Sequence, residues 1–511
     1  MESELKLRVE PDNVGRLKDH PLLAQYCRQP PQQTDMTATY YDTPDLLIRQ
    51  AKAHLRVRQS HQRWRQTFKA ELSTLAGLHR REEWETFVDG PEPDLEQLRQ
   101  QIGCHVHWQP LLQHLEQQLD LQPLFSTQVS RTVWNLHLPT GEEVEAALDE
   151  GSLTCGDLSL PIGELELELR SGQPASLFRL ALELIKVLPL RLDNRSKPDL
   201  GYALLARQTH PAVKATALSL SADSRVEQAF RAVISNCLAQ VQANEPGVAK
   251  SRAPDSLHQM RVGLRRLRSA LRLFERAIPC PASLQTQLEE LTAQLGVARD
   301  WDVLLGSTLP WASTRRDDPR DLTALRHALA EQATQAHQAA SRAVTSPAYS
   351  ELLLAFGAWL EERPWRDAPD GDPRRLDKAL DSFADKRLKQ AHGRLLRRAR
   401  GLKQAEPQRL HRLRIAAKRL RYACEFFQSL YPKRRLCNYV EALSGLQDEL
   451  GKLNDAHVAE ALLDRLLPEQ PALQPDVDWL KERLVALQAD EIKPLRQRWK
   501  QFKRIKRPWK R

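Results

Sequence analysis

The first residues of the chain alternate between charged and apolar side chains, and this pattern restricts what they can form. The charged side chains share one parity of the sequence: Glu2, Glu4, Lys6 and Arg8. The apolar side chains share the other: Leu5, Leu7 and Val9. A β-strand turns successive side chains to opposite faces, so the segment predicts a strand with one charged and one apolar face. A half-exposed strand with a solvated charged face gives the same pattern, so the decision depends on later segments.

Several later segments repeat the arrangement. Residues 162–169 place Glu164, Glu166 and Glu168 opposite leucines. Others carry basic or mixed charges on one parity: Arg56 and Arg58, Thr67 and Lys69, Arg81 and Glu83, Arg131, and Glu145 with Asp149. Many strands with one face rich in both signs predict a closed barrel with a polar lumen. Helices, expected near 94–103, 110–119 and 174–188, would then cover the outward apolar faces.

A lumen of this composition has a recognisable chemistry. Arginine and lysine bind phosphate oxygens, and carboxylates hold a hard divalent cation such as Mg²⁺. Carboxylates brought together without a metal repel one another, and so do clustered cations without a polyanion. Interleaving the two signs is what the binding of a metal–polyphosphate complex requires.

The same residues carry a family resemblance. Glu2-x-Glu4-x-Lys6 resembles the ExExK signature of CYTH domains, the triphosphate tunnel metalloenzymes. The match continues, in the family's order, through the basic and acidic pairs named above to Ser196-Lys197, and it covers roughly residues 1–205. The resemblance implies an eight-stranded antiparallel tunnel that acts on triphosphates with Mg²⁺ or Mn²⁺.

The resemblance also implies roles for individual residues. The expected catalytic set is Glu2, Glu4, Lys6, Arg56, Arg58 and Lys69. The expected substrate-binding set is Arg8, Arg81, Glu83, Arg131 and Lys197. The expected metal ligands are Glu2, Glu4, Asp149, Glu166 and Glu168. Glu164 is expected at the tunnel rim, and a lumenal salt bridge is the alternative role for any one of these side chains.

Charge divides the chain into two parts. Residues 1–210 hold 23 Lys and Arg against 30 Asp and Glu, whereas the remainder holds 53 against 36. The net charges are therefore −7 and +17, so a polyanionic partner is implied mainly for the second part.

The second part reads as almost entirely helical and contains an internal duplication. Residues 257–268 and 410–421 superpose with a shift of 153 residues, which aligns His258 with His411. In each copy, spacings of three and four residues put the basic side chains in one stripe beside an apolar stripe. A second matched pair follows at 295–302 and 450–457. The duplication predicts two similar helical bundles related by an approximate two-fold axis.

Duplicated HxxRxxxRxxR helices with LGxxRDxD segments resemble a CHAD domain, over about residues 220–511. The resemblance implies binding of inorganic polyphosphate by the basic faces: His258, Arg261, Arg265, Arg268, His411, Arg414, Lys418 and Arg421. The second copy departs from the pattern, with Asn454 in place of Arg299 and His457 in place of Asp302. Whether the two histidines bind phosphate or make buried hydrogen bonds stays open. The basic run at 500–511 is expected to be a frayed tail.

The domain boundaries follow from these matches. We expect an α+β architecture, with a CYTH tunnel domain at 1–205 flanked by helices, a linker at 206–222, and an all-α CHAD domain at 223–511. The two helical repeats are expected at about 223–375 and 376–511.

The favoured function is metal-dependent hydrolysis of inorganic triphosphate, with polyphosphate bound by the helical part. Thiamine triphosphatase and adenylate cyclase activity remain alternatives, because all three activities require binding of a triphosphate. A polyphosphate-binding scaffold with an inert tunnel is the non-enzymatic alternative. No recognised nucleic-acid motif is present. Seven scattered cysteines and no run of about 20 apolar residues predict a cytoplasmic protein without a membrane partner.

Overall fold

The computed structural model describes residues 2–60, 63–103, 105, 108–117, 121–207, 210–250, 252–313, 321–367, 373–400, 402 and 406–509. The chain divides into two compact units. The first comprises residues 1–209 and 345–363, and the second comprises residues 210–344 and 364–511. The chain thus leaves the first unit, returns to it for one segment and leaves it again.

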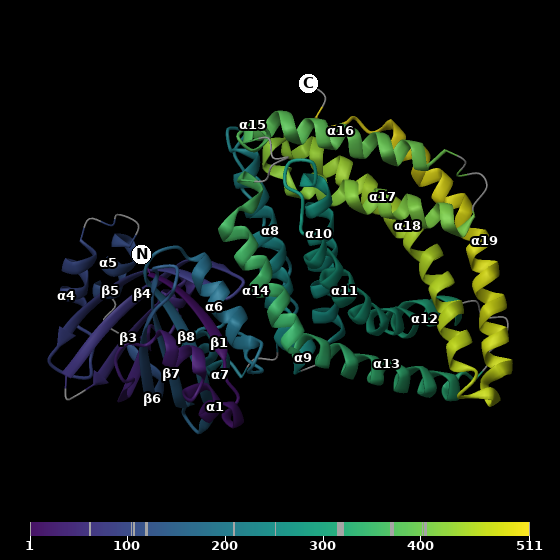
Figure 1. The fold of residues 1–511 in the computed structure, drawn as a ribbon. Helices are drawn as coiled ribbons and strands as arrows, with labels where there is room; N and C mark the ends of the chain where they lie inside the picture. The colour runs from purple at the N-terminus through teal and green to yellow at the C-terminus, as the bar shows by residue number, and fades with distance from the viewer. Residues whose placement is uncertain are drawn as a thin grey trace. The chain divides into compact units, whose positions relative to one another are not determined.

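The first unit is built on a closed antiparallel barrel (Figure 1). Its strands are β1 (Glu2–Arg8), β2 (Gln32–Asp42), β3 (Ala53–Ser60), β4 (Arg63–Leu75), β5 (Leu78–Val88), β6 (Gln122–His137), β7 (Glu143–Cys155) and β8 (Leu158–Ser171). They pair in the order β5-β4-β3-β2-β6-β7-β8-β1, and β1 closes the barrel by pairing with β5. A two-residue strand, β9 (Arg191–Leu192), adds to β1. The prediction of an eight-stranded antiparallel tunnel is confirmed.

Strand register sets charged side chains opposite one another. Lys6 of β1 faces Glu166 of β8, and the next inward pair along these two strands is Glu4 with Glu168. Lys69 of β4 pairs in the same way with Glu83 of β5, and Arg131 of β6 with Asp149 of β7. Directly opposed residues lie within about 5.5 Å at Cβ, so the register alone forces charges of both signs into contact.

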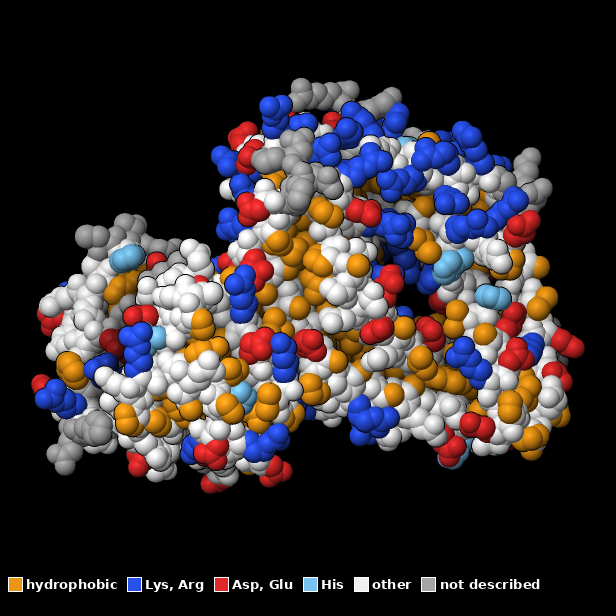
Figure 2. Space-filling view, viewed as in Figure 1, with side chains coloured by type: hydrophobic (Ala, Val, Ile, Leu, Met, Phe, Trp, Pro, Cys, Tyr) orange, Lys and Arg blue, Asp and Glu red, His pale blue; other side chains and the backbone are white. Residues whose placement is uncertain are grey.

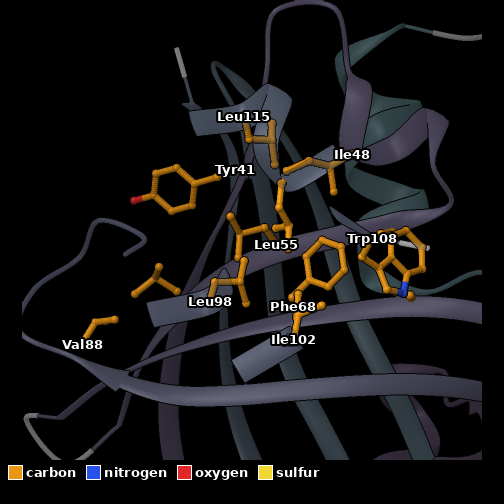
Figure 3. Packing of buried hydrophobic residues seen from close by; sticks show 13 residues of the cluster. Tyr41, Ile48, Leu55, Phe68, Val88, Leu98, Ile102, Trp108 and Leu115 are labelled. Atoms are coloured by element: carbon orange, nitrogen blue, oxygen red, sulfur yellow. The ribbon is translucent and has the colours of Figure 1, made fainter. Parts of the chain in front are cut away.

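The outward face of the barrel is apolar, as the alternation predicted. Leu55 of β3 and Phe68 of β4 are fully buried beneath two helices, α4 (Leu95–Ile102) and α5 (Gln109–Gln117), as Figure 3 shows. Trp108 stacks edge-on against Phe68 with ring centroids 5.5 Å apart. The Asp94 side chain caps α4 by accepting a hydrogen bond from the Gln97 amide. These contacts fix the barrel wall whose other face lines the lumen.

The remaining helices of the first unit are η1 (Pro11–Asn13), α1 (Val14–Lys18), α2 (Pro21–Tyr26), α3 (Leu47–Gln50), α6 (Ala175–Ile185), α7 (Lys197–Leu205) and α14 (Pro347–Glu362). Of these, α6 and α14 are longer than ten residues. Helix α7 starts at a capping box in which Ser196 and Asp199 bond each other's backbone amides.

Helix α14 is far from the barrel in sequence yet packs on its helix α6. At Gly357 an added Cβ would lie 2.1 Å from the ring of Phe178, so only glycine permits the approach. The Ser350 hydroxyl accepts a hydrogen bond from the Leu192 amide of β9 at 3.1 Å, and Glu361 pairs with Arg80 at 2.9 Å. This segment is part of the barrel unit, which the sequence matches do not indicate.

Helices are the regular secondary structure of the second unit, and its described residues include no named strand. Its first half contains α8 (Val226–Ala243), α9 (Glu245–Ala249), α10 (Pro254–Phe274), α11 (Ala282–Val303), η2 (Leu304–Thr308), α12 (Leu309–Ser313) and α13 (Thr323–Val344). Its second half contains η3 (Pro364–Arg366), α15 (Pro373–Leu376), α16 (Leu380–Arg398), α17 (Pro407–Phe426), η5 (Gln428–Leu430), α18 (Lys433–Leu466), η6 (Pro471–Leu473) and α19 (Gln474–Arg504).

Two reciprocal hydrogen bonds relate the halves. The Val226 amide donates to the Lys378 carbonyl, and the Leu380 amide donates to the Ser224 carbonyl, so α8 and α16 begin at equivalent positions. The basic motif helices are α10 and α17, which agrees with the predicted duplication.

The expectation of a frayed C-terminal tail is wrong for the described residues. Helix α19 continues to Arg504, and Phe502 and Trp509 are buried against Tyr439 of α18, with ring centroids 5.2 Å away in both cases. These aromatic side chains anchor the basic run, and residues 510–511 lie outside the described part. None of the described helices is long and apolar enough to span a membrane.

Candidate active site

The barrel lumen is a cavity of about 240 Å³. Most of the residues proposed for catalysis, substrate or metal line it: Glu2, Glu4, Lys6, Arg56, Arg58, Lys69, Arg81, Glu83, Arg131, Glu166, Glu168 and Lys197. Asp149 lies just behind this lining, buried under Arg131 and Lys197. Arg8 lies outside it, beside β9, where its Nε is 3.2 Å from Glu10.

Two lysines and two glutamates form a buried charge cluster. Lys6 Nζ lies 3.0 Å from Glu164 and also contacts Glu166, while Lys197 Nζ lies 2.6 Å and 2.9 Å from the same two carboxylates. Burial opposes the charge on Lys6, but Glu164 and Glu166 outweigh it and raise the pKa of the ammonium. Glu164 is 6% exposed, so the expectation that it sits at the rim is wrong.

Arg131 holds the acidic residue of β7. Its guanidinium makes two parallel hydrogen bonds to Asp149, at 2.6 and 2.7 Å, and a third to Glu166 at 2.7 Å. Such forked pairs are strong and directional. Lys197 and Arg131 overcome the effect of burial and lower the pKa of Asp149. Asp149 therefore orients two cations, and as folded its carboxylate oxygens are engaged by them.

A second cluster lies on the β1, β4 and β5 strands. Lys69 Nζ is 3.0 Å from both Glu2 and Glu83, and Arg81 Nη1 is 3.1 Å from Glu4. Burial first, and then the neighbouring Glu2, raise the pKa of Glu83 to about 7 despite Lys69. One lysine thus serves two carboxylates, which leaves this side of the lumen with excess negative charge.

The opposite imbalance occurs on β3. Arg56 makes no ion pair with a described residue and its Nε is buried without a hydrogen-bond partner, although burial is outweighed by Tyr40 and the nearby Glu83, which raise the pKa of its guanidinium. Burial, followed by repulsion from Arg56 and Arg131, lowers the pKa of Arg58 to about 10, although Glu85 lies 3.6 Å away. Buried cations without enough acceptors are unfavourable unless an anion joins them. This part of the lumen has the properties of an anion site.

The lumen also has donors suited to a hard cation. Burial and the neighbouring Glu2 and Glu145 raise the pKa of Glu168 to about 7, although Arg170 lies 2.6 Å away. A divalent cation favours the ionised form of crowded carboxylates, and oxygen donors are those that Mg²⁺ and Mn²⁺ accept. Among the described residues no three His, Cys, Asp or Glu side chains are arranged as a metal group. The donor chemistry fits the ion, and the side chains would have to exchange lysine and arginine partners to bind it.

Six lining residues were not among those proposed from the sequence: Tyr40, His54, Arg65, Glu85, Arg170 and Pro198. His54 shares the parity of Arg56 and Arg58, and Arg170 shares that of the β8 glutamates, so a stricter use of the alternation finds both. Burial and the nearby Arg81 lower the pKa of His54, which keeps the imidazole neutral. Tyr40 carries no charge, so the alternation gives no signal for it.

In the helical unit, the two motif helices bring their basic stripes together. We call Arg261 and Arg265 of α10, with Arg414 and Lys418 of α17, the central basic cluster. Burial, then Arg414 of the same helix and Arg265 of α10, lower the pKa of Lys418 to about 7. Arg265 also donates to the Tyr422 hydroxyl at 3.4 Å, and Arg261 Nε is buried without a partner.

The outer members of the stripes are better neutralised. Arg268 lies 2.8 Å from Glu289, and Arg421 lies 3.3 Å from Glu425. His258 is half-buried with an unpartnered Nδ1, and burial together with Arg299 lowers its pKa to about 4. His411 is exposed and shares a hydrogen bond with Asn454 at 3.0 Å. With this lowered pKa, His258 is neutral in the free protein at pH 7, so it can donate or accept a hydrogen bond but adds no positive charge to the stripe.

Comparisons with known proteins agree with both resemblances. The CYTH domain family matches residues 1–197, and the CHAD domain family matches residues 232–464. An inorganic triphosphatase of Haemophilus influenzae is 32% identical over 212 residues, which cover 40% of this chain and 56% of that protein. The matched region is thus less than two thirds of the relative's length.

A solved structure resembles the helical part. The crystal structure of the CHAD domain from the plant Ricinus communis is 39% identical, and the match covers 59% of this chain and 99% of that one, with a TM-score of 0.53. The protein therefore carries a CYTH domain, with the closed tunnel of the triphosphate tunnel fold, followed by a CHAD domain.

Proposed function

We propose that the tunnel hydrolyses inorganic triphosphate to diphosphate and phosphate, with Mg²⁺ or Mn²⁺ as cofactor. The observation that carries this proposal is the division of the lumen into two unbalanced sides. Arg56 has no ion-pair partner among the described residues and Arg58 is repelled by neighbouring arginines, while Glu83 and Glu168 are crowded by other carboxylates. A substrate that is anionic and is accompanied by a cation relieves both imbalances at once.

The side chains divide the work of hydrolysis among them. Arg56 and Arg58 would grip terminal phosphate oxygens, and Lys69 and Arg131 would bind those nearer the centre of the chain. Phosphoryl transfer to water requires compensation of negative charge and an in-line nucleophile rather than a covalent protein intermediate. Glu2, Glu4, Glu166 and Glu168 would hold the divalent ion, which supplies further charge compensation at the phosphates.

The lining favours inorganic triphosphate over the organic alternatives. Apart from Tyr40 and Pro198, every residue that lines the cavity is polar or charged. A nucleobase or a thiamine ring would need an apolar or aromatic surface to stack upon. One tyrosine ring, itself 2% exposed and stacked on Phe125, offers little such surface.

A substrate panel tests the proposal directly. Inorganic triphosphate, thiamine triphosphate and ATP are each supplied with Mg²⁺ and with Mn²⁺, and released phosphate, diphosphate and cyclic nucleotide are measured. We expect the highest kcat/KM for inorganic triphosphate. A higher value for either organic substrate, or cyclic nucleotide from ATP, would replace the proposed activity with that alternative.

We further propose that the CHAD domain binds inorganic polyphosphate through the central basic cluster and its flanking residues His258, Arg268, His411 and Arg421. The support is the shortage of acceptors around Arg261, Arg265, Arg414 and Lys418. Binding should weaken steeply as salt rises, because neutralisation of phosphate charge dominates it. Binding that is unchanged between low and high salt would contradict this assignment.

A further inference from the structure

The two helical repeats differ at one buried arginine position. In the first repeat Arg266 is 6% exposed and is held by α8, because its guanidinium donates to Gln240 and Asn236, each at 2.8 Å. Gln240 in turn donates to Gln259 at 3.2 Å. Neutral amide side chains between α8 and α10, which we call the amide ladder, therefore accept the hydrogen bonds of this charged arginine.

The second repeat retains only part of the amide ladder, since the counterpart of Asn236 is Gln390, which accepts a hydrogen bond from Arg387 at 3.3 Å. The shift of 153 residues that aligns the motifs makes Arg419 the counterpart of Arg266 and Arg412 the counterpart of Gln259. The paired starts of α8 and α16 set a shift of 154 residues for those helices, which makes Arg394 the counterpart of Gln240. The register is supported by burial, since Ile234 and Leu388 are both buried, as are Val241 and Leu395. Two amides of the first repeat are thus arginines in the second.

The replacement leaves a groove with unbalanced positive charge. The groove between α16 and α17 has a volume of about 590 Å³, and its lining is Ala391, Arg394, Arg397, Arg398, Arg412, Ile415, Ala416 and Arg419. No described carboxylate lies within ion-pair distance of any of the five arginines, and Arg412 reaches only the Gln408 carbonyl. Figure 2 shows Lys and Arg side chains gathered over α16 and α17. Burial, then Arg272 and Arg394, lower the pKa of Arg419, as expected for cations without a counter-charge.

We propose that the α16–α17 groove is a second polyanion site, which binds a stretch of inorganic polyphosphate beyond the central basic cluster. The inference rests on the proposed polyphosphate binding and extends it to a surface outside the duplicated motif. Ile415 and Arg419 also line a cavity of about 280 Å³ that contains Arg265 and Lys418, so the two basic surfaces are continuous around α17. The described lining has no aromatic ring on which a base could stack, which favours a phosphate chain over a nucleic acid.

The decisive variant makes the second repeat like the first. Arg394→Gln combined with Arg412→Gln installs the residue types of Gln240 and Gln259, so the fold already contains a precedent for the result. A matched control, Arg434→Gln with Arg435→Gln, removes the same charge from exposed positions at the start of α18. A third variant, Arg265→Gln with Lys418→Gln, weakens the central basic cluster.

The measurement is the affinity of the full chain for long-chain inorganic polyphosphate at several salt concentrations, with the melting temperature of the free protein. We expect the groove variant to bind about tenfold or more weakly at low salt, with a shallower salt dependence, because two charge-assisted contacts are lost. We expect its melting temperature to stay level or rise, since like-charge repulsion is removed. The control should bind within about twofold of the unaltered chain.

Three results would overturn the proposal. One is a groove variant that binds as tightly as the control, while the central variant loses affinity; this leaves the central assignment intact. Another is an unaltered chain that binds no polyphosphate, which removes the proposed function together with the second site. The third is a competition result: single-stranded DNA displaces polyphosphate from the unaltered chain but does not displace it from the groove variant. That result would assign the groove to nucleic acid.

Discussion

The tunnel and the central basic cluster both concentrate arginine and lysine, but they neutralise that charge differently. In the tunnel, each of Lys6, Lys69, Arg131 and Lys197 touches at least two carboxylates. In the central basic cluster, the closest described carboxylate contact is that of Arg414 with Asp455, at 3.4 Å. Interleaved charge suits a site that must hold an anion together with a cation, whereas charge of one sign suits binding alone.

The largest expected effect is a separation of the two activities. Glu4→Gln or Glu168→Gln should lower kcat for triphosphate hydrolysis by on the order of 10²-fold, because each removes a charge from the proposed cation site. Charge reversal at Arg261, Arg265, Arg414 and Lys418 should weaken polyphosphate binding strongly and leave hydrolysis unchanged. Steady-state kinetics and a binding titration on the same preparations provide the comparison.

Glu96→Gln is the matched control for the acidic variants, because Glu96 is an exposed carboxylate on α4, outside the lumen. Activity within a few-fold of the unaltered chain in both Glu4→Gln and Glu168→Gln would remove these residues from the site.

The second expected effect concerns the extent of the tunnel unit. A truncated chain of residues 1–210 lacks α14, so the α6 surface around Phe178 loses its cover. We expect residues 345–363, joined to this chain through a flexible linker, to raise its melting temperature by more than about 5 °C. Equal melting temperatures with and without α14 would show that residues 1–205 are a complete domain, as the sequence alone suggested.

A smaller effect on kcat/KM is expected when one of the cationic side chains proposed to bind phosphate is removed. Arg56→Ala and Lys69→Ala should each weaken kcat/KM by roughly 1.5–3 kcal/mol, the range for charge-assisted hydrogen bonds. Arg56 is the cleaner probe, because Lys69→Ala also frees Glu2 and Glu83. Arg28→Ala, at an exposed position, is the control. Unchanged triphosphate kinetics in both lumenal variants would mean that β3 and β4 do not contact substrate.

The smallest expected effect is a pH dependence of polyphosphate binding. The groups that act on Lys418 are Arg265 of α10, Arg414 and Arg421 of α17, and Asp455 of α18. Its pKa of about 7 in the free protein should rise when phosphate binds, so binding takes up a proton above pH 7. Affinity should therefore be greatest below pH 7 and fall as the pH rises from 7 to 9.

Lys418→Arg, which stays protonated over this range, should remove most of that decline. An identical decline in the Lys418→Arg variant, measured by titration at each pH, would assign the proton to another group.

The alternation of charge in the strands was sufficient to predict the closed tunnel and most of its lining. It worked because a strand has a fixed period of two and one face of each strand is buried by helices. It could not show that Asp149 lies behind Arg131 or that Arg8 leaves the lumen beside β9, because both depend on neighbours that are distant in sequence.

Features that depend on tertiary partners were not predictable. Helix α14 is apolar on nearly all sides, which indicates burial but not the unit against which it is buried. Part of the positive charge in the groove between α16 and α17 comes from Arg394 and Arg412, which stand where the first repeat has glutamines. That difference is visible only after the two repeats are placed in register. The C-terminal aromatic anchors were hidden in a run dominated by basic residues.

The most direct test of the central claim is the release of phosphate from inorganic triphosphate by the full, unaltered chain. Reactions contain Mg²⁺, Mn²⁺ or a chelator, and phosphate and diphosphate are both quantified. We predict equal amounts of the two products with either metal and no release with the chelator. A folded chain that binds triphosphate but releases no phosphate with either metal would contradict the account, and would leave the tunnel as a binding site only.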